Sequence, residues 1–111
     1  MKNGNSDTTN TTGPDLRDLT ALLKGLADEN RLRLLLYLAA GEKTVSSLVA
    51  ASGLSQPLVS HHLKELRRAL LVEVERRGPF VFCRLADPRI TALLEQWQQL
   101  TTELVARRHH L

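Results

Sequence analysis

The spacing of hydrophobic residues changes abruptly near Leu70, and this change constrains the fold more than any other feature of the sequence. Before it, across residues 56–70, apolar side chains recur every three to four positions, as on one face of a helix. After it, the segments LVEVE (71–75) and FVFCRL (80–85) alternate every second position, and RRGP between them supplies a turn. The middle of the chain is therefore expected to be a helix followed directly by a β-hairpin.

Two helices are expected in the first third of the chain. Leucines recur at helical spacing over residues 16–26, and Asp28 can then cap a second helix, ENRLRLLLYLAA, which Gly41 would end. The second helix is apolar on several sides, so we expect it to be central. Residues 1–14 contain almost nothing to bury and are expected to form a disordered tail before a single domain, residues 15–111.

A helix-turn-helix is expected just before the hairpin. Thr44 can cap a short helix, VSSLVAAS, and Ser55 can cap a longer one with Pro57 in its first turn. The turn between these helices is about three residues long and contains Gly53. A last helix follows the hairpin. The expected order, α-α-α-α-β-β-α, is that of a winged helix-turn-helix, a mostly α-helical fold in which the small β-hairpin is the wing.

Three motifs in this order resemble the ArsR/SmtB family of bacterial repressors, over roughly residues 19–105. They are the start Ala-Asp-x-x-Arg-Leu-Arg, the central Leu-Ser-Gln-x-x-Val-Ser-x-His-Leu and the exit Leu-Ala-Asp-Pro, and they are specific in combination. The resemblance implies a homodimeric regulator of transcription, usually a repressor, that binds an inverted repeat in double-stranded DNA. The alternative on the same fold is a module that binds DNA without sequence preference or binds another protein.

The second helix of the helix-turn-helix is expected to bury one face and to present another. A helix turns about 100° per residue, which groups four apolar side chains on one side and polar and basic side chains beside them. An ordinary amphipathic surface helix would show the same grouping. The side chains expected to face the core are Val59, Leu63, Leu66 and Leu70.

The polar side of this helix suits DNA, because an α-helix fits the major groove and the residues near its N-terminus reach the base edges. Gln56, Ser60 and His61 are the candidates for base contacts. His62 points elsewhere than its neighbour, so we assign His61 to DNA and His62 to packing or solvent. The other residues expected to contact DNA are Pro57, Lys64, Arg67 and Arg68 on the same helix and Arg76 and Arg77 at the tip of the hairpin.

Basic charge is concentrated in the middle of the chain. Residues 43–84 contain seven Lys or Arg and three Glu, whereas the remainder contains eight basic and nine acidic residues. This distribution favours a polyanionic partner, although a solvated charged surface would give the same count. Arg84 could join the DNA contacts or pair with Glu73 or Glu75.

The first and last helices carry apolar stripes with no evident use inside one small domain. A single recognition helix contacts few bases, so two copies about one helical turn apart on DNA would gain specificity. The resemblance implies that these helices form the two-fold interface, and closing the monomer core is the alternative. The residues expected at the dimer interface are Leu19, Leu22, Leu93, Trp97, Leu100 and Leu104.

Neither of the metal-sensing patterns that the resemblance implies is kept in this chain. The thiolate pattern Cys-Val-Cys falls on Thr-Val-Ser at residues 44–46, and hydroxyls are not thiolates. The pattern on the last helix keeps two carboxylates, but a cation and an apolar residue replace its two histidines. We therefore expect no metal site and no cofactor, and any inducer would be an unknown small molecule. The positions of the second pattern are Asp87, Arg89, Leu100 and Glu103.

Few other groups in the chain suggest chemistry. Cys83 is the only cysteine, so no disulfide can form within the chain, and its place on an apolar strand face predicts a buried, inert thiol rather than a redox switch. His109 and His110 are expected to belong to a frayed terminus. No phosphate loop, paired carboxylates or catalytic triad is recognisable, so we do not expect an enzyme. Because no segment has the length of a signal peptide or membrane span, a cytoplasmic location is expected.

Overall fold

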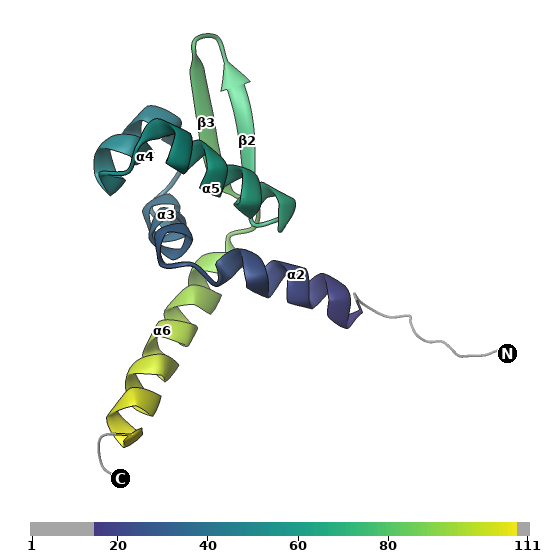
Figure 1. Ribbon diagram of the computed structural model, residues 1–111, viewed down its shortest axis with the longest axis vertical. Helices are drawn as coiled ribbons and strands as arrows, with labels where there is room; N and C mark the ends of the chain where they lie inside the picture. Colours follow the sequence, from purple (N-terminus) through teal and green to yellow (C-terminus); the bar gives the residue numbers. More distant parts are fainter. Residues whose placement is uncertain (1–14, 109–111) are drawn as a thin grey trace, which may run out of the picture.

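The computed structural model describes residues 15–108 (Figure 1). The predicted tail, residues 1–14, and the predicted frayed pair, His109 and His110, lie outside the described range. The predicted order of helices and hairpin is confirmed, with one addition, a two-residue strand before the third helix. The elements are α2 (Leu16–Leu26), α3 (Glu29–Ala39), β1 (Lys43–Thr44), α4 (Val45–Ser52), α5 (Gln56–Arg68), β2 (Val72–Arg77), β3 (Phe80–Leu85) and α6 (Arg89–Arg108).

Side-chain caps begin the helices where the sequence predicts them. Asp28, Thr44 and Ser55 each accept a hydrogen bond from a backbone N–H in the first turn of α3, α4 and α5, at distances of 3.0 to 3.3 Å. Gly53 ends α4 with a φ of 72°, a left-handed conformation that glycine adopts without strain. The cap at one end and the glycine at the other leave three residues between α4 and α5, which completes the helix-turn-helix.

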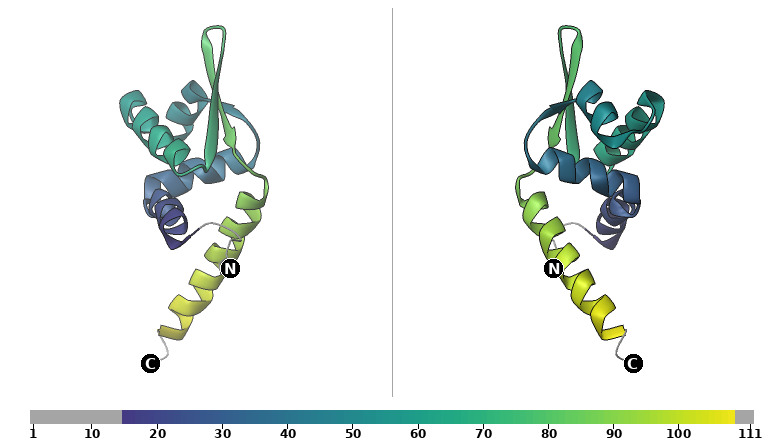
Figure 2. Two further views of the ribbon diagram at one scale, coloured as in Figure 1. Left: turned by 90° about the vertical axis from the view of Figure 1, so that its right-hand side faces the viewer. Right: turned by 90° about the vertical axis from the view of Figure 1, so that its left-hand side faces the viewer.

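The three strands form an antiparallel sheet in the order β1-β3-β2, and the hairpin of β2 and β3 projects from the body as the wing (Figure 2). The turn is shorter than the predicted RRGP, because only Gly78 and Pro79 lie between the strands. Arg76 and Arg77 are the last two residues of β2, where the prediction placed them in the turn. Their strand position has a direct consequence for where each side chain points.

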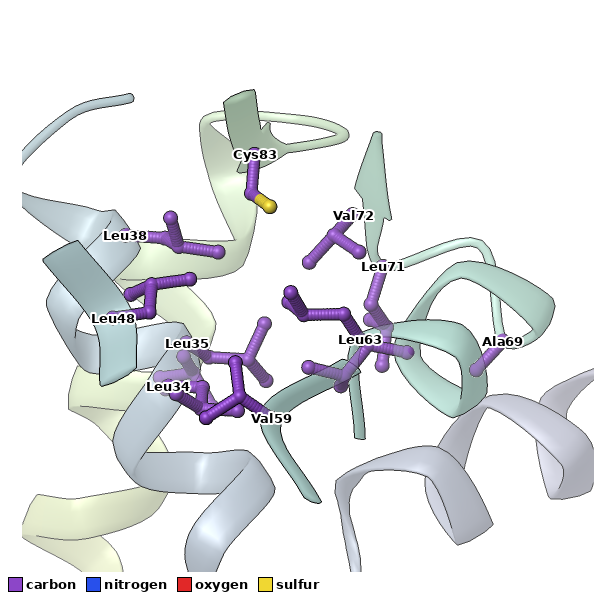
Figure 3. Close-up of a cluster of buried hydrophobic side chains, with 12 residues drawn as sticks. Leu34, Leu35, Leu38, Leu48, Val59, Leu63, Ala69, Leu71, Val72 and Cys83 are labelled. Atoms are coloured by element: carbon purple, nitrogen blue, oxygen red, sulfur yellow. The ribbon is translucent and has the colours of Figure 1, made fainter. Parts of the chain in front are cut away.

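The core lies where α3, α4, α5 and the sheet meet (Figure 3). Its centre is the predicted central helix, α3, whose Leu34, Leu35 and Leu38 are buried. Tyr37 of the same helix donates its hydroxyl to the carbonyl of Ala51 at 3.0 Å, which ties α3 to α4. The other buried apolar residues are Leu48, Val59, Leu63, Leu66, Ala69, Leu71, Val72, Cys83 and Leu94.

The prediction that Leu70 faces the core is wrong, because this side chain is 79% exposed. The helix α5 ends two residues earlier, and Leu70 takes a left-handed conformation with a φ of 66°. The N–H of Leu70 bonds to the carbonyl of Arg67 and the N–H of Leu71 to that of Leu66, the pattern of a Schellman motif with leucine at the position that glycine usually takes. The chain reversal turns Leu70 outwards and gives its place in the core to Leu71.

The helices α2 and α6 project from this body (Figures 1 and 2). The radius of gyration is 17.4 Å, against about 13 Å for a compact domain of this length. Each of these two helices has a single buried residue, Gly25 in α2 and Leu94 in α6. Gly25 lies where α2 crosses the end of α5, and a Cβ atom there would lie 2.5 Å from the Cβ of Ala69. No helix within residues 15–108 combines the length and apolar character needed to cross a lipid bilayer.

Candidate nucleic-acid interface

The exposed face of α5 carries the three side chains predicted to read bases. Gln56, Ser60 and His61 are all exposed. Because the Ser55 cap begins the helix just before Gln56, these side chains occupy its first two turns. Pro57, also exposed, lies beside them in the first turn. The predicted core face is confirmed for three buried residues, Val59, Leu63 and Leu66.

The two adjacent histidines point in different directions, as predicted. His61 is exposed, whereas His62 is only 6% exposed. Their ring centroids lie 5.6 Å apart, with the ring planes tilted by 53°. The Nδ1 atom of His62 has no hydrogen-bond partner among the residues that the structure describes. His62 therefore packs inside the protein, and His61 is the member of the pair that an external ligand can reach.

A shallow hollow of about 210 Å³ separates α5 from the wing. On its α5 side are the hydroxyl of Ser60 and the charged side chains of Lys64 and Arg67, and the remainder of its lining is apolar. An apolar floor beside two cations can accommodate a group that is partly apolar and carries negative charge. The lining residues are Val45, Ser60, Leu63, Lys64, Arg67, Val74 and Val81.

Three cations around this hollow are unpaired. Lys64, Arg67 and Arg76 form no ion pair with any carboxylate in residues 15–108. Arg68 differs, because it donates to Glu65 at 3.3 Å and lines hollows shared with α2 rather than with the wing. Three unpaired cations therefore lie on α5 and the neighbouring face of the wing, where a polyanion could meet them. The other cations without an ion pair in residues 15–108 are Lys24, Arg31, Lys43, Arg107 and Arg108.

Alternation along β2 places its two arginines on opposite faces of the wing. Residues paired across antiparallel strands share a face, and Arg76 is paired with Val81 while Arg77 is paired with Phe80. The face of Arg76 includes Val74 and Val81, which line the hollow beside α5. Arg77 therefore lies on the far side of the wing from α5.

On that far side, three carboxylates hold Arg77 and Arg84. Arg77 donates to both carboxylate oxygens of Glu42, at 2.9 and 2.8 Å, and to Glu75 at 2.9 Å. Arg84 donates to Glu73 at 3.0 Å, to Glu75 at 3.0 Å and to Glu42 at 3.2 Å. The hydrogen bonds from Arg77, followed by those from Arg84, keep the pKa values of Glu42 and Glu75 below their usual range. Of the two roles predicted for Arg84, pairing with Glu73 and Glu75 is the one observed.

Sequence reasoning missed Glu42, which accepts from both arginines. It precedes β1 and lies 35 positions from Arg77 in the sequence. The two-residue strand β1 brings it to the sheet by pairing Lys43 with Cys83 of β3. A strand this short has no recognisable alternation, so only its place in the fold reveals the contact.

A second candidate surface, on α2 and α6, is apolar. Trp97 is 56% exposed and Leu93 is 55% exposed, and of the six residues predicted at the dimer interface only Leu22 packs against the core. A hollow of about 490 Å³, lined by Leu22, Leu70 and the first turns of α6, lies beside them. Large exposed apolar patches commonly mark surfaces that bind another macromolecule. The predicted interface residues that are exposed are Leu19, Leu93, Trp97, Leu100 and Leu104.

The positions where the resemblance places metal ligands have other structural roles. The Thr44 hydroxyl caps α4. Asp87 accepts two hydrogen bonds from the guanidinium of Arg89, at 3.1 and 2.9 Å, and these bonds lower the pKa of Asp87 to about 2. Ser46, Leu100 and Glu103 are exposed. Within residues 15–108, no cluster of three or more His, Cys, Asp or Glu residues is arranged to hold a metal ion.

Cys83 is buried, as predicted, on the face of β3 that packs against the core. Burial, together with the negative charge of Glu42, raises the pKa of its thiol to about 11. At neutral pH the sulfur is therefore a protonated, weakly nucleophilic thiol.

The sequence matches known proteins over the region just described. Residues 28–74 match the family model of the bacterial regulatory proteins of the arsR family. The biofilm growth-associated repressor of Agrobacterium fabrum is 38% identical over 78 residues, which cover 70% of this chain and 67% of that protein. The HTH-type transcriptional repressor SmtB of Mycobacterium tuberculosis is 41% identical over 73 residues, covering 66% of this chain and 54% of that protein. The match thus spans about half to two thirds of the length of these relatives.

The fold matches solved structures over most of the chain. One is the homodimeric winged helix-turn-helix DNA-binding domain of a possible ArsR-family transcriptional regulator from Mycobacterium bovis. It superposes with a TM-score of 0.75 at 30% identity and covers 86% of this chain and 89% of that one. The winged helix-turn-helix of this chain is therefore a known architecture.

Proposed function

Because this chain belongs to the arsR family of bacterial regulatory proteins, we propose that it is a sequence-specific, DNA-binding repressor of transcription that acts as a homodimer. One observation carries this proposal. The exposed start of α5 lies beside a hollow around which Lys64, Arg67 and Arg76 have no described acidic partner. A surface that keeps its cations unpaired beside an exposed helix suits the phosphates and bases of DNA.

The exposed side chains at the start of α5 read the bases. With α5 in the major groove, Gln56 can pair with adenine, while Ser60 and His61 each offer one hydrogen bond to a base edge. Pro57 fits the groove wall in the same turn. Their exposure and their place in the first two turns support this assignment.

The phosphate backbone crosses the hollow between α5 and the wing. A deoxyribose ring can rest on the apolar floor formed by Val74 and Val81, with its phosphate near Lys64 and Arg67. Arg68, towards α2, contacts a phosphate on the other side of α5 after exchanging its partner Glu65. Contacts of this kind position the protein without reading sequence.

Two copies of the chain associate through α2 and α6. The exposed Trp97 and leucines of these helices support a self-complementary apolar interface, and the Mycobacterium bovis neighbour is described as homodimeric. Two-fold symmetry would present two α5 helices about 34 Å apart, so the operator is an inverted repeat.

The repressor has either an inducer that is not a metal or no inducer. The hydroxyl of Thr44 is used in a helix cap, and the carboxylate of Asp87 is held by Arg89. Neither position offers the thiolate or imidazole that a transition metal prefers. If there is an inducer, it is a small molecule of unknown class rather than a metal ion.

A competition experiment tests sequence-specific binding. Purified protein is incubated with sheared DNA of its own genome, the retained fragments are sequenced, and one fragment is then used in a gel shift. We expect the shifted band to survive an excess of random-sequence competitor, because specific sites are bound about 10³-fold or more tightly than non-specific DNA. Loss of the band at equal mass of competitor would instead indicate a module that binds DNA without selection.

A further inference from the structure

The two neighbouring arginines at the end of β2 lie on opposite faces of the wing, and only one of them is unpaired. We propose that Arg76 is the phosphate contact of the wing, whereas Arg77 is a positioning residue that sets the angle of the wing on the body. This inference rests on the proposed DNA-binding function for Arg76 but not for Arg77, whose partners all lie within the chain.

Arg77 bridges the full width of the sheet. It is on the edge strand β2, and its guanidinium lies over the ring of Phe82 on the central strand β3, with 4.4 Å between the guanidinium carbon and the ring centroid. Beyond that ring it makes two parallel hydrogen bonds to Glu42, next to β1 on the other edge. The side chain therefore runs from the tip of the wing back towards its base.

Glu42 is a suitable anchor because of where it lies in the chain. It follows the central helix α3 and directly precedes β1, so it belongs to the body rather than to the projecting hairpin. Beyond β1, no strand within residues 15–108 pairs with that side of the hairpin. The bidentate pair with Glu42 attaches the part of the hairpin beyond β1 to the body a second time, in addition to the backbone pairing with β1. The planar guanidinium of Arg77, stacked on an aromatic ring, restricts the direction of the hairpin.

Among the described residues, acidic side chains outnumber the two arginines of the cluster on this face. Arg77 and Arg84 share three carboxylates, those of Glu42, Glu73 and Glu75. The cluster has a net charge of −1, and a phosphate approaching Arg77 would meet acidic side chains that already occupy its donors.

Arg76 has the opposite surroundings. It is exposed, it has no described acidic partner, and its face of the wing is the one that closes the hollow with Lys64 and Arg67. A phosphate in the hollow would meet Lys64 and Arg67, which line it, and Arg76 lies on the same face of the wing as the lining residues Val74 and Val81. Arg76 is therefore the arginine whose charge contributes to binding.

Lysine substitutions separate the two roles. A lysine keeps the positive charge needed beside a phosphate. It lacks the planar guanidinium that forms a bidentate pair with Glu42 and stacks on Phe82. We therefore compare Arg76→Lys, Arg76→Gln, Arg77→Lys and Arg77→Gln by two measurements. The first is hydrogen exchange of the β2 and β3 amides in free protein, and the second is the salt dependence of binding to a random-sequence DNA duplex.

We expect both Arg77 variants to lose protection at the wing amides, while neither Arg76 variant does so. In DNA binding we expect Arg76→Gln to reduce the slope of log affinity against log salt by about 0.9 for each wing, with Arg76→Lys keeping the wild-type slope. The two Arg77 variants should have the same slope as each other. If Arg77→Gln lowers the slope and Arg77→Lys restores it, Arg77 is a phosphate contact and the proposal is wrong.

The two measurements also separate this inference from the proposed function. Unchanged exchange protection in both Arg77 variants would overturn the positioning role, whatever the DNA result. Loss of protection together with no DNA binding by the wild-type protein would retain that role for Arg77 and overturn the DNA-binding function, and with it the role of Arg76.

Discussion

Two regions of the molecule cover their apolar side chains to very different extents. In the body, where α3, α4, α5 and the sheet meet, Leu34, Leu35 and Leu66 are completely buried by the same chain. On α2 and α6, side chains of similar or larger size, such as Trp97 and Leu104, are about half exposed. A single chain therefore buries the apolar core of the body, which carries the candidate DNA surface. It leaves the apolar side chains of the projecting helices exposed. Under the proposed homodimer, the second copy covers them.

The largest expected effect is a core truncation in the body. Leu35→Ala removes a buried side chain that the chain itself covers, and it should lower the free energy of unfolding by about 2–5 kcal/mol. Chemical denaturation at several protein concentrations measures this loss. A loss below about 1 kcal/mol would mean that the body is less tightly packed than the structure indicates.

Truncation on α6 should act on association rather than on the body. Trp97→Ala removes the largest exposed apolar side chain and should weaken dimerisation by about 2 kcal/mol, roughly 30-fold, as for a central interface residue. Sedimentation equilibrium measures the change, and Glu95→Ala, on the opposite side of the helix, is the matched control. Equal dimerisation of the wild type and Trp97→Ala would contradict the predicted interface.

The contact between the two regions is sensitive to one glycine. Gly25→Ala places a Cβ 2.5 Å from the Cβ of Ala69, so α2 must move away from the end of α5, at an expected cost of about 1–3 kcal/mol. The double variant Gly25→Ala/Ala69→Gly removes the opposing Cβ and should recover most of the loss in thermal unfolding. Failure of the double variant to recover stability would show that the two helices do not meet at this point.

A smaller effect is expected at Leu70, where the body joins the apolar surface. Leu70→Ala and Leu70→Gly remove the same exposed side chain beyond Cβ, but only glycine adopts a φ of 66° freely. Leu70→Gly should therefore be about 1 kcal/mol more stable than Leu70→Ala. Identical unfolding midpoints would indicate that the helix does not end in the left-handed conformation.

The smallest effect concerns the thiol in the body. The pKa of Cys83 is about 11 in the folded protein, above its ordinary value of 9.0, so folding favours the protonated form. Its contribution to stability is complete below pH 9 and is lost as the pH rises towards 11. A thiol-labelling assay at pH 7 should show slow reaction in folded protein and fast reaction after denaturation. Fast labelling of the folded protein would contradict the burial.

Local signals in the sequence predict most of the fold. The caps Asp28, Thr44 and Ser55 and the change of period near Leu70 act within a few residues, so they determine the helices and hairpin independently of distant contacts. The start of α5 and its buried face follow from the same periodicity. The different directions of His61 and His62 follow from their angles on the helix, whereas the choice of packing over solvent for His62 comes from the structure.

The sequence-based predictions are wrong or incomplete where contacts with distant residues, or an unusual helix end, determine the position of a side chain. Leu70 turns outwards because a Schellman end forms without the glycine that would have signalled it. Arg77 pairs with Glu42 because a two-residue strand brings a remote segment to the sheet. The opposite faces of Arg76 and Arg77 would have followed from the sequence had the turn been limited to Gly78 and Pro79, since alternation can be counted outwards from a two-residue turn.

The most direct test of base reading by α5 in a two-fold dimer is a hydroxyl-radical footprint on the retained genomic fragment. It is made with the wild-type protein and with Gln56→Ala/Ser60→Ala/His61→Ala. We expect two protected half-sites related by two-fold symmetry, with centres about 34 Å apart, and loss of this pattern in the triple variant. A single unsymmetrical protected site, or an unchanged footprint from the triple variant, would contradict this expectation.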